Sequence, residues 1–278
     1  MNMLTFHLDH GEKIFYLDEN TAGYPVMLLL HGLGVNSRSW QLQIPAFTGA
    51  GYRILAPDLP GFGQSCKSQF SSIPQVASEI AVLLHSSHVT SAIVCGISMG
   101  GILALQLTLD HPDLVSRLIL VNSMAKLSIG NPLLWPFFLW RYILVQSRGL
   151  EEQAEVVANR LFPQPKDSLY RQAAIESIME ADLESYKAAM RSIAKFNVQK
   201  RLSEIHSPTL VFTGENDSTI PARNQRRMAE RIPGALHIII KNAGHAVIID
   251  QPDLFNNCVL NFLENRAISK NPSLMVMN

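Results

Sequence analysis

The sequence GISMGG at residues 96–101 places a serine, Ser98, between closely spaced glycines. A nearly continuous apolar run at 92–95 precedes it, and an apolar helical pattern at 99–109 follows it. In such a strand, turn and helix, the glycines let strand and helix approach closely, and the serine hydroxyl projects above the sheet. The pattern therefore favours Ser98 as a nucleophile over a serine that only caps a glycine-rich turn.

A serine hydroxyl is a weak nucleophile at neutral pH, so it needs a base that accepts its proton and returns it to the leaving group. Among the nine histidines, His245 has the most suitable position. It follows the predicted strand 236–240 and should lie in a loop at the carboxyl edge of the sheet, where Ser98 is also expected. We therefore predict that His245 is the base.

A catalytic histidine also needs a carboxylate that orients it and stabilises its charged form. Two acidic residues directly follow the predicted strand 210–213, and we predict that Asp217 is the orienting one. The resulting chain order of serine, acid and histidine is the one expected of a serine elbow on an α/β sheet. Glu215 is the nearest competitor, Asp250 is weaker, and a structural role in a turn is expected for Asp58.

Attack on a carbonyl creates an oxyanion that two backbone N–H groups can stabilise. The amide of Met99 is one predicted donor, because it directly follows the nucleophile. The other is the amide of Leu33, in the flexible sequence HGLG at 31–34 after the predicted strand 26–30. His31 is expected to brace this loop by hydrogen bonds.

Short β-branched or leucine-rich runs alternate with helical patterns along the chain, which indicates a mostly parallel sheet flanked by helices. The predicted sheet has eight strands: a hairpin from 4–8 and 13–17, then 26–30, 53–56, 92–95, 118–121, 210–213 and 236–240. The predicted helices are 74–85, 99–109, 221–231 and 252–264. Residues 267–278 have no clear pattern.

The alternation stops between residues 124 and 198, where aromatic and helical patterns occur without a convincing strand. We interpret this segment as an inserted helical cap on a core formed by 1–123 and 199–278. Its aromatic cluster should supply the wall of a substrate pocket, and the residues selected for that wall are Trp135, Phe138, Trp140 and Arg141. An acidic substrate would need a cation, for which the candidates are Arg141, Arg148, Lys187, Arg191 and Lys195.

The chain of 278 residues carries 23 basic and 23 acidic side chains, so it lacks the basic excess of a nucleic-acid-binding protein. The balanced charge also gives no electrostatic support for stable membrane attachment. Three widely spaced cysteines suggest neither a disulfide framework nor a zinc site, and favour a reducing, cytoplasmic location. We expect a monomer or homodimer with no metal and no organic cofactor.

These motifs together resemble the α/β-hydrolase superfamily over nearly the whole chain. The matching sequences are HGLG at 31–34, PDLPGFGQS at 57–65, GISMGG at 96–101, GENDSTIP at 214–221 and NAGHAVIIDQP at 242–252. In detail they look most like the branch of 3-oxoadipate enol-lactonases, small carboxylesterases and meta-cleavage C–C hydrolases. The resemblance implies the α/β-hydrolase fold, with Ser98, Asp217 and His245 as the catalytic triad.

The expected function is hydrolysis of a carboxylic ester or lactone of a small, partly apolar substrate through an acyl-enzyme on Ser98. A meta-cleavage C–C hydrolase and a thioesterase are the alternative enzymes, because they use similar chemistry. A ligand receptor on the same fold is the alternative without catalysis.

Overall fold

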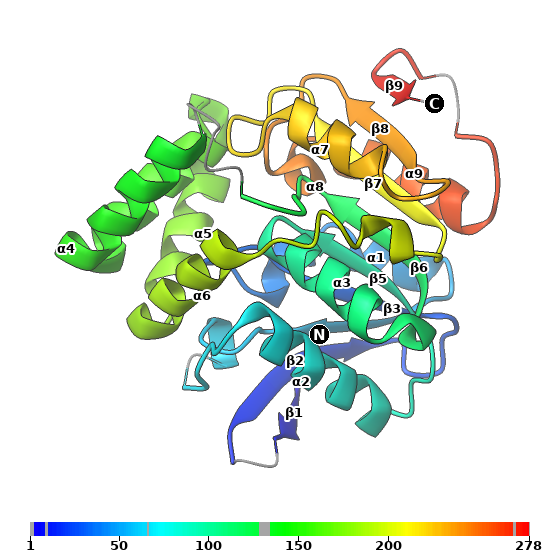
Figure 1. The fold of residues 1–278 in the computed structure, drawn as a ribbon, viewed down its shortest axis with the longest axis horizontal. Coiled ribbons are helices and arrows are strands. Elements are labelled where there is room, and N and C mark those ends of the chain that lie inside the picture. The colour runs from blue at the N-terminus through cyan, green and yellow to red at the C-terminus, as the bar shows by residue number, and fades with distance from the viewer. Residues whose placement is uncertain (1–2, 9–10, 66, 128–133, 269–270, 278) are drawn as a thin grey trace.

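The structure is a computed structural model that describes residues 3–8, 11–65, 67–127, 134–268 and 271–277 (Figure 1). Within these residues nine strands form one sheet in the order β1-β2-β4-β3-β5-β6-β7-β8-β9. Pairing is parallel from β4 through β3 to β8 and antiparallel at both ends. The strands are β1 Met3–His7, β2 Lys13–Glu19, β3 Val26–Leu30, β4 Arg53–Pro57, β5 Ala92–Ile97, β6 Val115–Val121, β7 Thr209–Gly214, β8 Leu236–Ile240 and β9 Leu274–Met277.

The eight predicted strands are present, and β9 is an addition that the sequence did not predict. It lies in the tail 267–278, where it pairs antiparallel with β8, so that Val276 lies opposite Ile238. Its four residues are too few to show a period of two. The strand forms because β8 would otherwise leave a row of unpaired backbone groups at the edge of the sheet.

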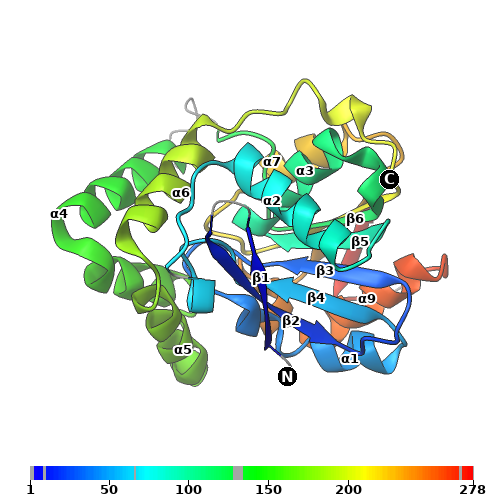
Figure 2. The same cartoon turned by 90° about the horizontal axis from the view of Figure 1, so that it is seen from below.

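Helices cover both faces of the sheet, as the alternation of strands and helices predicts. Figure 2 shows α2, α3 and α7 on one side and α1 and α9 on the other. The helices are α1 Ile44–Gly49, α2 Ile73–Ser86, α3 Met99–Asp110, α4 Leu134–Leu161, α5 Ser168–Met179, α6 Leu183–Lys195, α7 Ala222–Ala229, α8 Val247–Asp250 and α9 Pro252–Leu263. No helix in the described ranges is long and apolar enough to cross a bilayer.

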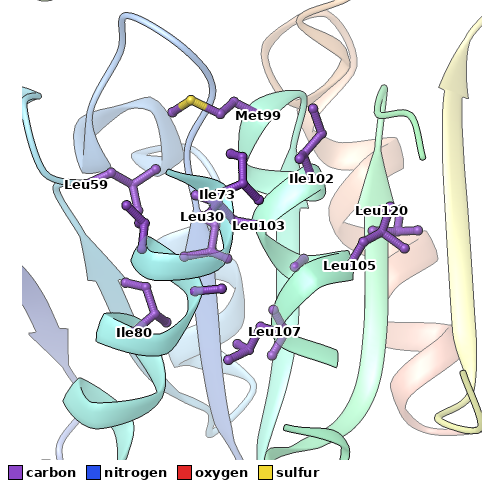
Figure 3. Packing of buried hydrophobic residues seen from close by; sticks show 14 of the residues in the cluster. Leu30, Leu59, Ile73, Ile80, Met99, Ile102, Leu103, Leu105, Leu107 and Leu120 are labelled. Atoms are coloured by element: carbon purple, nitrogen blue, oxygen red, sulfur yellow. The ribbon is translucent and has the colours of Figure 1, made fainter. Parts of the chain in front are cut away.

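The helix that follows Ser98, α3, lies in the interior of the protein. Its residues from Met99 to Leu109 are all buried, so it has no solvent-facing stripe. Figure 3 shows Leu103 and Leu107 of α3 near Ile80 of α2, and Leu105 directed toward β6. Because α3 is fixed on all sides, it provides a rigid support for the turn at Ser98.

The chain between β6 and β7 forms α4, α5 and α6, which gather at one end of the sheet in both views (Figures 1 and 2). These helices occupy the segment 124–198 that the sequence predicts to be helical, of which 128–133 lie outside the described residues. Helix α4 changes direction at Gly149, whose φ of 76° is not helical. The two halves of α4 can therefore face different neighbours.

The packing of α9 on β7 gives a test of the core. Phe255 and Phe212 are fully buried, with ring centroids 4.8 Å apart. We expect Phe255→Ala to lower the free energy of unfolding by about 3–5 kcal/mol, because it removes a large apolar contact and leaves a cavity. Leu169→Ala, at a position that is 82% exposed, should change it by no more than about 0.5 kcal/mol in the same urea titration. Equal effects would contradict this account of the core.

Candidate active site

The turn at Ser98 has a backbone conformation that few residues adopt. Ser98 has φ 54° and ψ −114°, directly between the end of β5 and the start of α3. A β-carbon at Gly96 would overlap the carbonyl of Gly100, and one at Gly100 would overlap the carbonyl of Leu30. Glycines are therefore required where the strand and helix meet, and the packed elements hold Ser98 in a strained turn.

His245 and Asp217 form a direct pair. The Nδ1 atom of His245 lies 2.9 Å and 3.0 Å from the two carboxylate oxygens of Asp217. The backbone amides of Thr219 and Ile220 also donate to Asp217 Oδ1, at 2.8 and 2.9 Å. Because the Asp217 carboxylate accepts a hydrogen bond from Nδ1, His245 carries a proton on Nδ1. The Nε2 atom is therefore free to accept a proton.

Ser98 and His245 line the same cavity, which has a volume of about 300 Å³. Among the described residues, the Ser98 hydroxyl has no hydrogen-bond partner. Such bonds are often long or absent until a substrate is bound. The geometry thus brings the predicted nucleophile and base to one cavity and pairs the base with Asp217.

The other candidate acids have different partners. Glu215 accepts from the backbone amide of Asn242, and Asp250 accepts from that of Gly244 at 2.6 Å. Burial raises the pKa of Asp250. Both carboxylates therefore hold the loop that carries the histidine and do not contact its ring.

Asp58 has the structural role that the sequence predicts for it. Its two carboxylate oxygens accept from the backbone amides of Ser37 and Gln64, each at 2.8 Å. The carboxylate is buried, so these two donors offset part of the cost of removing its charge from water. Asp58 therefore joins the loop after β3 to the loop after β4.

The loop that carries Leu33 is braced by His31. The Nδ1 atom of His31 lies 2.8 Å from the carbonyl of Gly32, and its Nε2 accepts from the amide of Leu59 at 2.9 Å. Full burial lowers the pKa of His31, which keeps the ring neutral. Leu33 and Met99 both line the cavity, which is consistent with the predicted pair of oxyanion donors.

Asn122 was missed by the sequence analysis and connects the acid loop to the histidine loop. It is fully buried at the end of β6, in the left-handed region with φ 43°. Its Nδ2 donates to the carbonyls of Gly244 and His245 at 3.0 and 2.7 Å, and its Oδ1 accepts from the amide of Gly214 at 2.8 Å. Asparagine after a strand is a signal for such a bend, but the sequence does not show which loops it joins.

A buried hydrogen-bonded chain that begins at Gln225 also supports Asp217. The Nε2 of Gln225 donates to Asp217 Oδ2 at 3.2 Å and to the carbonyl of Ile220 at 3.0 Å. Its Oε1 must therefore accept from the Thr213 hydroxyl, at 3.0 Å. The Thr213 oxygen then accepts from His237 Nε2 at 2.9 Å, which leaves His237 Nδ1 unprotonated and without a partner among the described residues.

Two of the four residues selected for the pocket wall, Phe138 and Arg141, line the cavity. Trp135 and Trp140 do not line the cavity. Trp135 packs against Phe138, with ring centroids 6.4 Å apart, and Trp140 is 47% exposed. The prediction that Trp135 and Trp140 line the pocket is therefore wrong. Only one side of α4 faces the cavity, and an aromatic cluster on a helix cannot present every ring to the same side.

Arg160 also lines the cavity. The sequence analysis missed it because it lies far along the chain from the aromatic cluster. The guanidinium of Arg160 lies 3.9 Å from the centroid of the Phe137 ring, which also lines the cavity. The other cationic candidates lie elsewhere: Arg148 is exposed and paired with Glu152, Lys187 is paired with Glu184, and neither Arg191 nor Lys195 lines the cavity.

The described cysteines are not poised for reaction. Cys95 and Cys258 are buried without a disulfide partner, and Cys66 lies outside the described residues. Burial raises the pKa of both described thiols, that of Cys258 to about 11, so neither is a thiolate at neutral pH. The described ranges also contain no group of three or more His, Cys, Asp or Glu side chains placed to hold a metal ion.

Asn122→Asp tests the connection between the two loops. The aspartate can still accept from Gly214 but cannot donate to the carbonyls of Gly244 and His245, so the histidine loop should lose its position. We expect kcat for ester hydrolysis, the activity that the sequence predicts, to fall by about tenfold or more. Asn265→Asp, also at positive φ but exposed, is the matched control and should retain wild-type kcat. An unchanged kcat in Asn122→Asp would contradict the role of this connection.

His237 should make stability depend on pH. Burial, followed by the charge of Arg226, lowers its pKa from 6.5 to about 4. Between these values the unfolded chain binds the extra proton and the native state does not, so acid favours unfolding. As the pH falls through this interval, the wild type should lose up to about 1.4 kcal/mol per pH unit relative to His237→Gln, measured by urea unfolding.

The matched control for this prediction is His206→Gln, at an exposed histidine, which should keep the wild-type dependence. His31 is unchanged in all three proteins, so its contribution cancels in the comparison. Parallel curves for the wild type and His237→Gln would show that His237 is protonated equally in both states.

Comparison with known proteins agrees with this architecture. Residues 25–252 match the alpha/beta hydrolase fold family. A putative carbamate hydrolase RutD from Agrobacterium fabrum is 30% identical over 251 residues, covering 87% of this chain and 94% of the relative. Its counterpart from Variovorax paradoxus is 27% identical over 257 residues, covering 90% and 96%.

Among solved structures, the enol-lactonase from Burkholderia xenovorans LB400 superposes with a TM-score of 0.85 at 22% identity, covering 94% of this chain and all of that one. A likeness at this identity shows the fold. The match to the family extends from the strand before the Leu33 loop to the loop after His245, so it includes every residue of the candidate site. The chain belongs to the alpha/beta hydrolase fold family.

Proposed function

We propose that the protein is a serine hydrolase that cleaves a carboxylic ester or lactone of a small, partly apolar substrate. The single observation that carries this proposal is the convergence of Ser98, on a strained turn, with the His245–Asp217 pair at one cavity. These side chains come from three loops that are far apart in sequence. The sheet places these loops at one edge, but its packing does not require the three side chains to meet. Activation of a hydroxyl does require them to meet.

In the proposed mechanism, the Ser98 hydroxyl attacks the substrate carbonyl while His245 Nε2 takes its proton. The amides of Leu33 and Met99 stabilise the oxyanion. His245 then donates the proton to the leaving alcohol, and the C–O bond breaks to give an acyl-enzyme. A water molecule, deprotonated by His245, attacks the acyl carbonyl; the bond to Ser98 Oγ then breaks as His245 returns the proton to Oγ, and the acid is released. Asp217 keeps the imidazole oriented and stabilises its charged form.

The shape of the cavity supports a small substrate. Its volume of about 300 Å³ lies at the lower end of the range for ligand pockets. Apolar side chains such as Leu127, Phe138 and Ile248 form much of its wall. We propose that residues 124–198 act as a cap that sets substrate choice, because α4 and α5 supply part of the cavity lining.

Carbamates are a second substrate class, favoured by the relatives named putative carbamate hydrolases. The same nucleophile and oxyanion donors can act on a carbamate carbonyl, although the nitrogen attached to that carbonyl makes it less electrophilic than an ester carbonyl. A panel of esters, lactones, carbamates, thioesters and vinylogous diketones, assayed by identifying the products, separates these classes. Preference for the diketones would indicate a C–C hydrolase, and slow acylation without turnover would indicate a receptor.

The nucleophile is tested with Ser98→Ala. We expect the wild type to hydrolyse short 4-nitrophenyl esters and to be labelled at Ser98 by a fluorophosphonate. Ser98→Ala should lose the labelling and at least about 10⁴-fold in kcat, because the hydroxyl that forms the acyl-enzyme is removed. Ser203→Ala, at an exposed serine that does not line the cavity, is the control and should behave as wild type.

Peptide mapping of the labelled wild type identifies the modified residue directly. A label on another residue, or full turnover in folded Ser98→Ala, would overturn the assignment. The wild-type far-ultraviolet circular dichroism spectrum provides the check that the variant is folded.

A further inference from the structure

We infer that the substrate carries a carboxylate, which Arg141 and Arg160 bind in the cavity that Ser98 also lines. This inference deepens the proposed function and rests on it for the identity of the scissile bond. The charges that line the cavity carry this inference. Two guanidinium groups, both on α4, lie there without an acidic partner among the described residues.

Arg141 is held by neutral groups. The residue is 9% exposed, and its Nη2 donates to the Tyr186 hydroxyl at 3.0 Å. The amide oxygen of Gln153, turned toward Arg141, accepts from its Nε at 2.9 Å and from the Tyr186 hydroxyl at 3.0 Å. These bonds fix the orientation of the guanidinium but supply no negative charge. A buried cation without a counter-ion is costly, and an anionic ligand removes that cost.

Arg160 lies close enough to Arg141 for each to repel the other. Both guanidinium groups lie over the Phe137 ring, with centroid distances of 5.8 Å for Arg141 and 3.9 Å for Arg160. Arg160 donates to the carbonyl of Ser218, whereas its Nε is buried and has no acceptor among the described residues. Burial, followed by the charge of Arg141, lowers the pKa of Arg160.

The acidic groups nearest to this pair are already engaged. Asp217 contributes a favourable charge at Arg160, but its oxygens are occupied by His245, Gln225 and backbone amides. Of the glutamates that line the cavity, Glu180 is paired with Arg38, and Glu176 accepts from Gln172. The two arginines thus retain unused donors, and paired guanidinium donors fit the two oxygens of a carboxylate.

The apolar wall limits what the rest of the substrate can be. Phe137 contacts both cations, and most of the other residues that line the cavity are apolar. A short hydrocarbon chain with a reactive carbonyl near Ser98 and a carboxylate beside the arginines satisfies both regions. The chemical class is therefore a monoester of a short dicarboxylic acid, or a small lactone that carries a carboxylate.

The test compares two esters of equal chain length, 4-nitrophenyl hydrogen glutarate and neutral 4-nitrophenyl pentanoate. We expect the wild type to have a higher kcat/KM for the glutarate ester, after subtraction of the spontaneous reaction. The ratio of the two kcat/KM values should fall by about tenfold or more in Arg160→Gln, because charge-assisted hydrogen bonds are lost. Arg160→Lys, which keeps the charge without the fork, should give an intermediate ratio.

Arg148→Gln is the matched control. It removes the same charge from the same helix, at an exposed residue outside the cavity, and should keep the wild-type ratio. An equal fall in Arg148→Gln would mean that long-range charge causes the preference, and an unchanged ratio in Arg160→Gln would overturn the inference.

A binding measurement separates failure of this inference from failure of the proposed function. Calorimetry of glutarate with Ser98→Ala should detect binding that Arg160→Gln, added to that variant, weakens by about tenfold or more. This binding would support the carboxylate site even if no ester is hydrolysed. Hydrolysis of both esters at equal rates, without glutarate binding, would retain the hydrolase and refute the carboxylate site.

Discussion

The site depends on a backbone conformation that only close packing can maintain. Ser98 has positive φ, which an ordinary residue leaves unless its neighbours prevent it. Here the neighbours are fixed, because α3 is buried along its whole length and glycines bring its first turn against β5 and β3. A buried helix has no exposed side along which it can shift without opening cavities in the core. The strain is thus held by the same core that stabilises the fold.

A second constraint applies to the acid and the base, which occupy loops and not regular elements. Asp217 accepts from backbone amides of its own loop and from Gln225, so the carboxylate cannot rotate away. Asn122 joins the loops that begin at Gly214 and end at His245, and Asp250 holds the latter at Gly244. Buried hydrogen bonds of this kind are costly to break, since each leaves a polar group without water. Loops can therefore hold a precise pair.

The helices between β6 and β7 add chemistry of a different kind. The sheet and its loops carry the proposed catalytic residues, whereas α4 contributes cations and aromatic rings to the lining of the cavity. The turn at Gly149 divides α4, and Arg141 and Arg160 come from its two halves, yet both reach the Phe137 ring. A straight helix of that length would spread these residues along its axis. Under the proposed function, specificity is thereby separated physically from reactivity.

The sequence alone determined the order of the strands and helices, because buried parallel strands and amphipathic or buried helices leave distinct apolar periods. It also indicated Ser98, Asp217 and His245, since each follows a strand whose carboxyl end must lie at the same edge of the sheet. It did not reveal β9, whose formation depends on the free edge of β8 and not on a pattern within its own residues.

Only the tertiary structure decided which groups meet. It paired Asp217 and not Glu215 with His245, turned Trp135 and Trp140 away from the cavity, and brought Arg160 beside Arg141. It also showed Asn122 and Gln225 as supports that no local motif marks. The physical reason is that periodicity fixes the face on which a side chain lies, whereas contacts between loops and across a bent helix depend on how distant segments pack.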